Sequence, residues 1–298
     1  MANLTQLLLF WPTVITAVIS PIIILSLYLY VTLPLLRPVI VLLWLLSIFS
    51  IFTTVSYTTP SNWFSRSIYK SLMPSTIKDL GWKIKDRSGF DHSRQAIYIW
   101  YPHSHFAITP FALIAGGMGD SVWKRSTMLC VAPPFFDLPA IRHISLGFGL
   151  VRSDYDSMKG SLKQGTSIVI LPGGAKEVSL ATGSQIRLVD GRKGFLRLAK
   201  ELNLPIIPVI AYGENAFFER DSVESSGSLH TLMKAMGGGL QAPSWASMKA
   251  WFNRPVDPVT VKIWKPFIME PDWSIETSMK KWKKHIYECD SKIEWVSA

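Results

Sequence analysis

The chain has 298 residues, enough for one catalytic domain with a membrane anchor or for two modest domains. Hydrophobic residues make up 48% of it and the mean hydropathy is +0.23, which is high for a fully soluble enzyme. Its two cysteines, Cys130 and Cys289, are far apart and outside any CxxC motif, which excludes a disulfide framework and a cysteine-based zinc site. No cluster of carboxylates or imidazoles has metal-ligand spacing either, so we expect no metal.

Charge is distributed very unevenly along the chain. Arg37 is the only charged residue between Met1 and Ser65, whereas the other 30 of the 31 basic residues and all 21 acidic residues follow. The basic excess of the later part favours anionic partners, such as lipid headgroups or the phosphates of a nucleotide-containing substrate. A basic surface without a partner explains the charge equally well. We expect no nucleic-acid binding, because zinc-finger and RNP-type motifs are missing.

The first 60 residues predict a membrane anchor. Residues 7–31 carry no charge and are long enough to span a bilayer, and a second apolar run covers residues 39–57. Two prolines and Arg37 lie between the runs, where they break the helix and resist burial. The pattern predicts a transmembrane helical hairpin at residues 1–60 followed by a catalytic domain at residues 61–298. Because the second run is short, a re-entrant half-hairpin stays open, whereas a cleaved signal peptide is disfavoured.

Strand-like and helix-like segments alternate in the later part of the chain. Aliphatic and β-branched runs predict strands, and amphipathic runs predict helices. The expected strands are 95–100, 127–131, 167–171, 206–210 and 259–264, and the expected helices are 109–115, 156–164, 192–202 and 273–293. Pro208 argues that its strand is an edge strand or contains a bulge. The alternation predicts an α/β fold with a mixed, largely parallel sheet flanked by helices, whose ligands bind beyond the carboxyl ends of the strands.

A histidine motif follows the first of these strands. Residues 101–105 read YPHSH, and Pro102 stiffens the turn that presents His103. An alcohol cannot attack a thioester unaided, but a neutral imidazole near pH 7 can take its proton as the bond forms. His103 is therefore the candidate catalytic base, with His105 as a second candidate. A polar loop histidine without a function accounts for the position equally well.

A glycine motif follows the strand at 167–171. Gly173 and Gly174 let main-chain amides approach a ligand closely, so these amides could hold a thioester oxyanion or a phosphate. Glu177 could orient and polarise the histidine, or complete a charge pair. The motif is not a P-loop, because no GK[ST] follows the glycines. A purely structural tight turn remains the alternative.

Two cations, Arg192 and Lys193, stand at the start of a predicted helix. Together with free main-chain amides they could bind the phosphates of a coenzyme, although a solvated charged face is the simpler interpretation.

Two missing motifs argue against two other classes of enzyme. No GxSxG elbow is present, which disfavours a serine hydrolase of the common type, and no GxGxxG follows a strand, which disfavours a dinucleotide enzyme.

Together these segments resemble the diacylglycerol acyltransferase type 2 family, which includes monoacylglycerol and wax-alcohol acyltransferases. The resemblance runs from about Ala96 to Glu214 and more loosely to the C-terminus. The family patterns HPHG, GGAxE, RKGF and PVxxFGEN are similar to residues 101–104, 173–177, 192–195 and 208–215 here. Four motifs in the same order and spacing are far more specific than any one of them.

The resemblance implies a glycerolipid-acyltransferase-like fold and transfer of a fatty acyl group from acyl-CoA, without a cofactor, to a neutral glycerolipid. Diacylglycerol is the implied acceptor. It also implies an endoplasmic reticulum membrane or lipid droplet, with the catalytic domain facing the cytosol. His103 matches the histidine expected to be catalytic, and Glu177 matches the acidic residue. The residues matched to substrate binding are Pro102, Gly173, Gly174, Arg192, Lys193, Glu214 and Asn215.

The sequence departs from the family at two positions. Tyr101 stands where the family has its first histidine, and Ser104 where it has a glycine. The HxxxxD dyad of related glycerolipid acyltransferases is also absent, because Ile108 lies five residues past His103 and Pro110 five past His105. An inactive membrane-anchored lipid-binding relative and a lipid esterase therefore stay open. So do monoacylglycerol, long-chain alcohols and lysophospholipids as acceptors, and homo-oligomerisation.

Overall fold

A computed structural model describes residues 81–104, 107–133, 136, 145–181, 185–217 and 258–297, together with residues 30, 32, 37, 38, 41 and 45. Nearly all of the predicted hairpin, and the domain boundary at residue 60, lie outside this part of the chain. None of the helices that are described combines the length and the hydropathy needed to cross a bilayer. The hairpin and the division into two domains therefore stay predictions.

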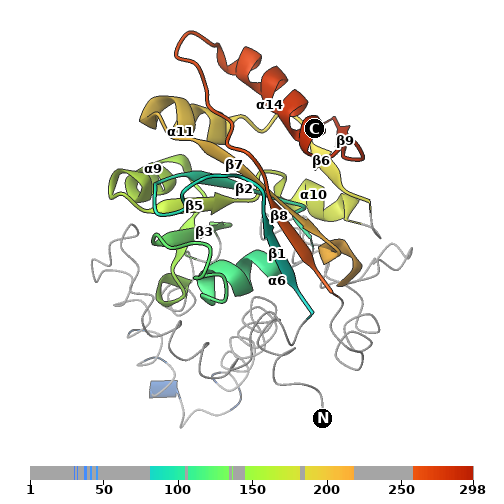
Figure 1. Cartoon of the computed structure of the whole chain (residues 1–298). Coiled ribbons are helices and arrows are strands. Elements are labelled where there is room, and N and C mark those ends of the chain that lie inside the picture. The colour runs from blue at the N-terminus through green and yellow to red at the C-terminus, as the bar shows by residue number, and fades with distance from the viewer. Residues whose placement is uncertain are drawn as a thin grey trace.

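A seven-stranded sheet forms the centre of the molecule, in the order β1-β8-β7-β2-β5-β3-β4 (Figure 1). The strands are β1 Lys83–Asp86, β2 Ile97–Tyr101, β3 Thr127–Val131, β4 Leu150–Arg152, β5 Ser167–Ile170, β7 Ile206–Tyr212 and β8 Thr260–Ile263. The five strands from β7 to β4 run parallel, β8 is antiparallel to β7, and β1 is parallel to β8. The predicted mixed, largely parallel sheet is confirmed. The carboxyl ends of β5, β2 and β7 consequently meet at one edge, with β2 between the other two.

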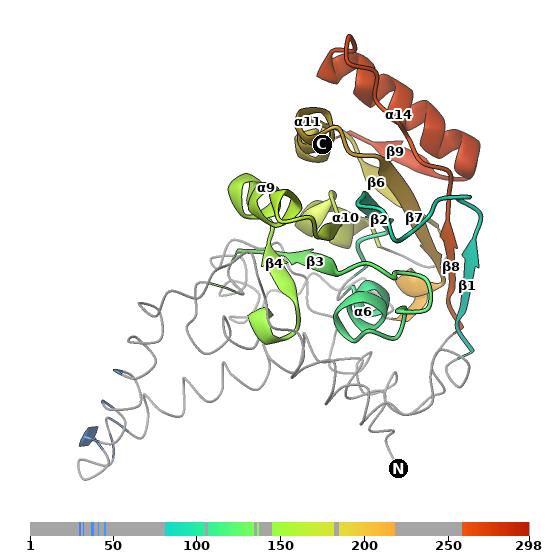
Figure 2. The same cartoon turned by 60° about the vertical axis from the view of Figure 1, so that its left-hand side comes forward.

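Helices cover the sheet on both faces (Figure 2). One face packs against α9 Tyr155–Lys163, α11 Gly194–Leu202 and α14 Ile275–Cys289, and the other against α6 Ile108–Pro110, which continues as the π-helical turn η2 Phe111–Ala115. Side chains alternate along β2, as a strand buried on both faces requires. Tyr101 therefore faces α14, whereas its neighbour Trp100 faces α6.

A small parallel sheet of two strands completes the fold. It pairs β6 Arg187–Val189 with β9 Glu294–Val296. The sequence analysis predicted neither strand. It also predicted that the last helix runs to residue 293, whereas α14 ends at Cys289 and Asp290 has an extended backbone. Two short elements lie after the central strands: α10 Gly174–Leu180 after β5, and the 3-10 turn η3 Glu214–Phe217 after β7.

Pro208 does not mark an edge strand. Its strand, β7, pairs with β2 on one side and with β8 on the other, so the edge prediction is wrong. A bulge does lie in this ladder, but its extra residue is in the segment after β8 and not in β7. The pairing register shifts by one residue between Val209, which faces Ile263, and Ile206, which faces Phe267. The proline thus lies where the regular ladder with β8 has ended, and its missing N–H interrupts no regular pairing.

Candidate active site

The loop after β2 presents His103 with a defined tautomer. The Nδ1 atom of the ring lies 3.0 Å from the main-chain carbonyl oxygen of Ser104. A carbonyl can only accept, so Nδ1 carries the proton of the neutral ring and the Nε2 lone pair remains available. No other described residue bonds to Nε2. Burial lowers the pKa of His103 below its usual value, opposed by nearby main-chain hydrogen bonds, so the ring is neutral near pH 7 and suited to act as a base.

Glu177 holds the main chain of His103 and not its ring. From α10, the carboxylate Oε2 accepts a hydrogen bond from the His103 N–H at 3.0 Å, and Oε1 accepts one from the Val189 N–H at 3.2 Å. Among the described residues Glu177 thus neither contacts the His103 ring nor forms a charge pair, the two roles that the sequence left open, and bonds to main-chain N–H groups instead. Burial raises the pKa of Glu177 to about 7, although both hydrogen bonds favour the ionised form.

The two glycines of the turn are required for different reasons. A Cβ atom on Gly173 would overlap the Glu177 side chain, which folds back over this residue. Gly174 has a φ of +55°, in the left-handed region that glycine adopts without strain. The glycine pair thus lets the carboxylate of Glu177 turn back toward the loop after β2.

A second buried carboxyl holds the far end of the same loop. Glu214, in η3, accepts a hydrogen bond from the Thr109 N–H at 3.0 Å and a long one from the indole N–H of Trp100 at 3.4 Å. Its side chain is completely buried, and burial raises its pKa to about 7, opposed mainly by the Thr109 bond and also by the hydroxyl of Ser104. The sequence placed Glu214 near the site only through the family resemblance.

These contacts follow directly from the order of the strands. β2 lies between β5 and β7, and the segment after each of these neighbours supplies one buried glutamate to the loop that follows β2. Glu177 holds the start of the loop at His103, and Glu214 holds its end at the first turn of α6. The structure therefore brings together three of the four predicted motifs: the histidine motif, the glycine motif with Glu177, and the segment with Glu214.

The other predicted substrate-binding residues lie around this centre. Asn215 donates from Nδ2 to the carbonyl of Gln185 at 3.1 Å, and its buried Oδ1 has no partner among the residues that the structure describes. Arg192 is exposed, with no described partner, whereas Lys193 forms an ion pair with Glu276 of α14 at 3.1 Å. No described contact joins either cation to His103.

The histidine motif also contains Tyr101, Pro102 and His105. Pro102 is buried and follows a cis peptide bond from Tyr101. His105 lies outside the described residues. The Tyr101 side chain, which replaces the family's first histidine, is almost fully buried; its hydroxyl accepts a hydrogen bond from the Trp282 indole N–H at 3.5 Å. This position is therefore part of the packing against α14.

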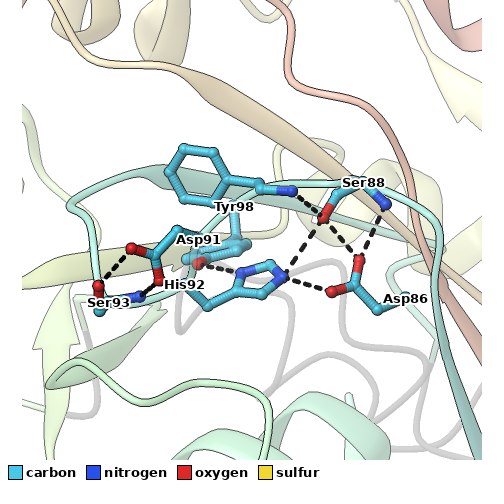
Figure 3. Close-up of polar contacts among 7 residues, drawn as sticks. Asp86, Ser88, Asp91, His92, Ser93 and Tyr98 are labelled. Carbon is cyan, nitrogen blue, oxygen red and sulfur yellow. Dashed lines mark hydrogen bonds and ion pairs between the residues drawn. The ribbon is translucent and has the colours of Figure 1, made fainter.

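A second histidine cluster, which the sequence analysis did not predict, lies where β1 ends and β2 begins, away from the carboxyl end of β2 that leads to His103. Figure 3 shows its contacts. His92 bonds through Nε2 to Asp86 at 3.0 Å and through Nδ1 to the hydroxyl of Tyr98 at 2.8 Å. Ser88 Oγ donates to Asp86 at 2.6 Å and lies 3.4 Å from the histidine. Since the hydroxyl donates to the carboxylate, the histidine does not activate it as a nucleophile. The cluster joins the end of β1 to the beginning of β2.

Comparison with known proteins places this arrangement in a family. The profile of the family described as "Diacylglycerol acyltransferase" matches residues 27–243, well over half of the chain. Diacylglycerol O-acyltransferase 1 of Eremothecium gossypii is 32% identical over 41% of this chain and 28% of its own length. Diacylglycerol O-acyltransferase 2 of Dictyostelium discoideum is 26% identical over 45% and 42%, and human acyl-CoA wax alcohol acyltransferase 2 is 25% identical over 55% and 54%.

These alignments thus span only 28% to 54% of the relatives' own lengths. A solved structure, the 1-acyl-sn-glycerophosphate acyltransferase of Thermotoga maritima, aligns over 98% of both chains with a TM-score of 0.43 and 15% identity. The family profile covers the histidine, glycine and Arg-Lys motifs and the Glu214 segment, which include the residues that build the loop after β2. On that match, the chain belongs to the diacylglycerol acyltransferase family.

Proposed function

We propose that the protein transfers a fatty acyl group from acyl-CoA to a neutral glycerolipid, with His103 as the general base. The observation that carries the proposal is the bond between His103 Nδ1 and the Ser104 carbonyl, which leaves Nε2 free to accept a proton. Nε2 takes the proton of the acceptor hydroxyl while its oxygen attacks the thioester carbonyl. The carbon–sulfur bond then breaks, and the imidazolium returns the proton to the leaving CoA thiolate. An ester and free CoA result.

Main-chain amides around Gly173 and Gly174 are the proposed donors to the oxyanion, and Arg192 with Lys193 the proposed site for CoA phosphates. Lys193 would have to exchange its partner Glu276 for the phosphate. Glu177 and Glu214 act as positioning residues in this mechanism, since each bonds to the main chain of the loop that carries the base or follows it.

Diacylglycerol is the proposed acceptor and triacylglycerol the product. Two relatives named above are diacylglycerol O-acyltransferases, and human 2-acylglycerol O-acyltransferase 1 and a wax-alcohol acyltransferase are also similar. The proposed location is the endoplasmic reticulum membrane or the lipid droplet surface, with the catalytic domain in the cytosol. The apolar first 60 residues support it, because both acyl chain and acceptor dissolve in the bilayer.

The test is lipid synthesis in membranes from cells that lack their own triacylglycerol-forming enzymes. Labelled oleoyl-CoA is supplied with diacylglycerol, monoacylglycerol or hexadecanol to the native chain, to His103→Ala and to His285→Ala. The last variant is a histidine control on α14: in the native chain the Nε2 atom of His285 lies 2.9 Å from the Lys265 carbonyl oxygen, the ring packs against Phe267 and Trp282, and none of its described contacts is with His103. We expect label in triacylglycerol, a loss of roughly 100- to 10,000-fold in His103→Ala, and near-native transfer in the control.

The other outcomes separate the alternatives. Label in a different ester keeps the mechanism and corrects the acceptor. Release of labelled fatty acid without any acceptor indicates an esterase. If well-expressed native protein transfers nothing to any of the three acceptors, acyl transfer is wrong and a lipid-binding role replaces it.

A further inference from the structure

The last strand of the structure lies beside two segments of the candidate active site. β9 pairs in parallel with β6, with Leu188 opposite Trp295 and Val189 opposite Val296. Figures 1 and 2 both show the two strands side by side next to α14. Along the chain, β6 comes between α10, which carries Glu177, and the Arg192–Lys193 turn. Through β6, the strand pair is thus connected in sequence to two of the family's motifs.

The first connection from β9 to the site passes through Glu177. Val296 accepts a hydrogen bond from the Asp190 N–H at 2.8 Å and is the register partner of Val189. The Val189 N–H donates to Glu177 Oε1, while Oε2 of the same carboxylate accepts from the His103 N–H. β9 is therefore connected to the main chain of His103 through the hydrogen bond to Asp190, the backbone of Val189 and the Glu177 carboxylate.

The second connection passes through aromatic rings. The Trp295 ring packs edge to face against Tyr101, with 6.4 Å between ring centroids and an angle of 82° between the planes. Tyr101 is the last residue of β2, two positions before His103. The Trp295 ring also contacts the Lys283 ammonium of α14, which lies over it 5.4 Å from the ring centroid and pairs with Asp190. Trp295 is thus held between α14 and the strand that leads into the loop.

We propose that β9 is a positioning element of the active site and that Trp295 is its positioning residue. Its pairing with β6 fixes the Val189 amide that orients Glu177, and its tryptophan supports the end of β2. The first contact reaches the His103 N–H through Glu177, and the second reaches Tyr101, two residues before His103. The proposal rests on the proposed function where it concerns catalysis, whereas the support of the loop can be measured without a substrate.

Two variants of the full chain test it. Glu294→Pro removes the N–H that donates to the Ile186 carbonyl at 3.2 Å and so opens the β6–β9 ladder. Glu294→Ala is its control, because it keeps this N–H and loses only the side-chain contacts to Arg187 and Gln185. Trp295→Ala removes the ring, and Trp295→Phe restores an aromatic contact. Tyr287→Ala is a matched aromatic control, because Tyr287 is 58% exposed on α14.

Hydrogen exchange and acyl-transfer kinetics are measured on each variant. We expect Glu294→Pro and Trp295→Ala to speed exchange of the His103 and Val189 amides on the order of tenfold, with native protection kept in β3 across the sheet. The kcat should fall on the order of tenfold while the KM for oleoyl-CoA stays within about twofold, because positioning is lost and not binding. Trp295→Phe should recover most of the amide protection and most of the kcat. The controls Glu294→Ala and Tyr287→Ala should match native protein in both measurements.

Unchanged exchange at His103 and Val189 in both variants would overturn the proposal, as would a kcat loss of the same size in the controls. Faster exchange throughout the sheet would also overturn it, since β9 would then serve global stability. Native protein without acyl transfer counts against the proposed function alone. Local loss of protection in Glu294→Pro would still support β9 as the support of the His103 loop.

Discussion

Glu214 accepts a hydrogen bond from the main-chain N–H of Thr109 across 105 residues of sequence. Glu177 does the same for the N–H of His103 across 74 residues. Two carboxyls from the segments after neighbouring strands thus hold the two ends of one loop. Both are buried, so each must have partners in the protein, and removing one acceptor leaves a buried donor that costs about 1 to 3 kcal/mol.

Glu214→Gln should flatten part of the pH dependence of stability. The pKa of Glu214 is raised from its usual 4.5 to about 7, so between these pH values the native state holds a proton that the unfolded chain has lost. Stability is therefore fully present below pH 4.5 and falls as the pH rises toward 7. We expect the free energy of unfolding of the native chain to fall on the order of 3 kcal/mol more than that of the variant across this window.

Denaturant unfolding of the full chain in detergent, at several pH values, measures this difference. Glu177 has the same raised pKa and is present in both proteins, so the comparison isolates Glu214. Parallel stability curves for the two proteins would contradict a raised pKa at this residue.

The pH–rate profile of acyl transfer should report a neutral His103. A base must be unprotonated, and burial lowers the pKa of His103 from 6.5. We expect kcat/KM, which reports the pKa of the free enzyme, to be flat from about pH 7 upward and to fall on the acid side with a midpoint below 6.5. Initial rates at oleoyl-CoA concentrations well below its KM measure it, with the residual rate of His103→Ala as the reference. A midpoint above 7 would be inconsistent with this environment.

Gly173→Ala should disable the site through Glu177. The added methyl would overlap the Glu177 side chain, which must then leave the His103 N–H. We expect kcat to fall roughly 100-fold, as for a displaced catalytic group. Gly147→Ala is the control, because a Cβ at that residue meets nothing within 4 Å and its φ is not left-handed. Equal kcat values for the two variants would show that the return of Glu177 toward the loop is not needed.

The cluster around His92 should affect stability and leave catalysis unchanged. His92→Ala removes two buried hydrogen bonds, so we expect a loss of about 2 to 4 kcal/mol in unfolding free energy. The kcat should stay within about twofold, since the cluster lies where β1 ends and β2 begins, away from the carboxyl end of β2 that leads to His103. Ser88→Ala serves as a second test in the same assay. Loss of activity in that variant would indicate a serine nucleophile, which the bond from Ser88 to Asp86 argues against.

The strands that the sequence predicts well are those with strong local patterns. The run TMLCV forms β3 with the predicted bounds, and the aliphatic run after Gly165 forms β5. Strands β1, β4, β6 and β9 were missed, because each has only three or four residues and no aliphatic run. Such strands are stabilised by partners elsewhere in the chain: β6 pairs with β9 more than a hundred residues away.

The sequence did not predict the contacts among the candidate site residues. The sequence and the family resemblance pointed to His103, Glu177 and Glu214. The sequence did not predict that both glutamates would bond to main-chain N–H groups. Every residue except proline carries such a donor, so no residue type identifies the partner. The ring partner of His103 is likewise a main-chain carbonyl.

The position of β2 between β5 and β7 has a consequence for synthesis of the chain. While the ribosome is still short of residue 214, the loop after β2 already exists but lacks the acceptor for the Thr109 N–H. The nascent chain therefore lacks this hold on the Thr109 end of the loop, and the loop can take its final place only after β7 has been made and paired with β2.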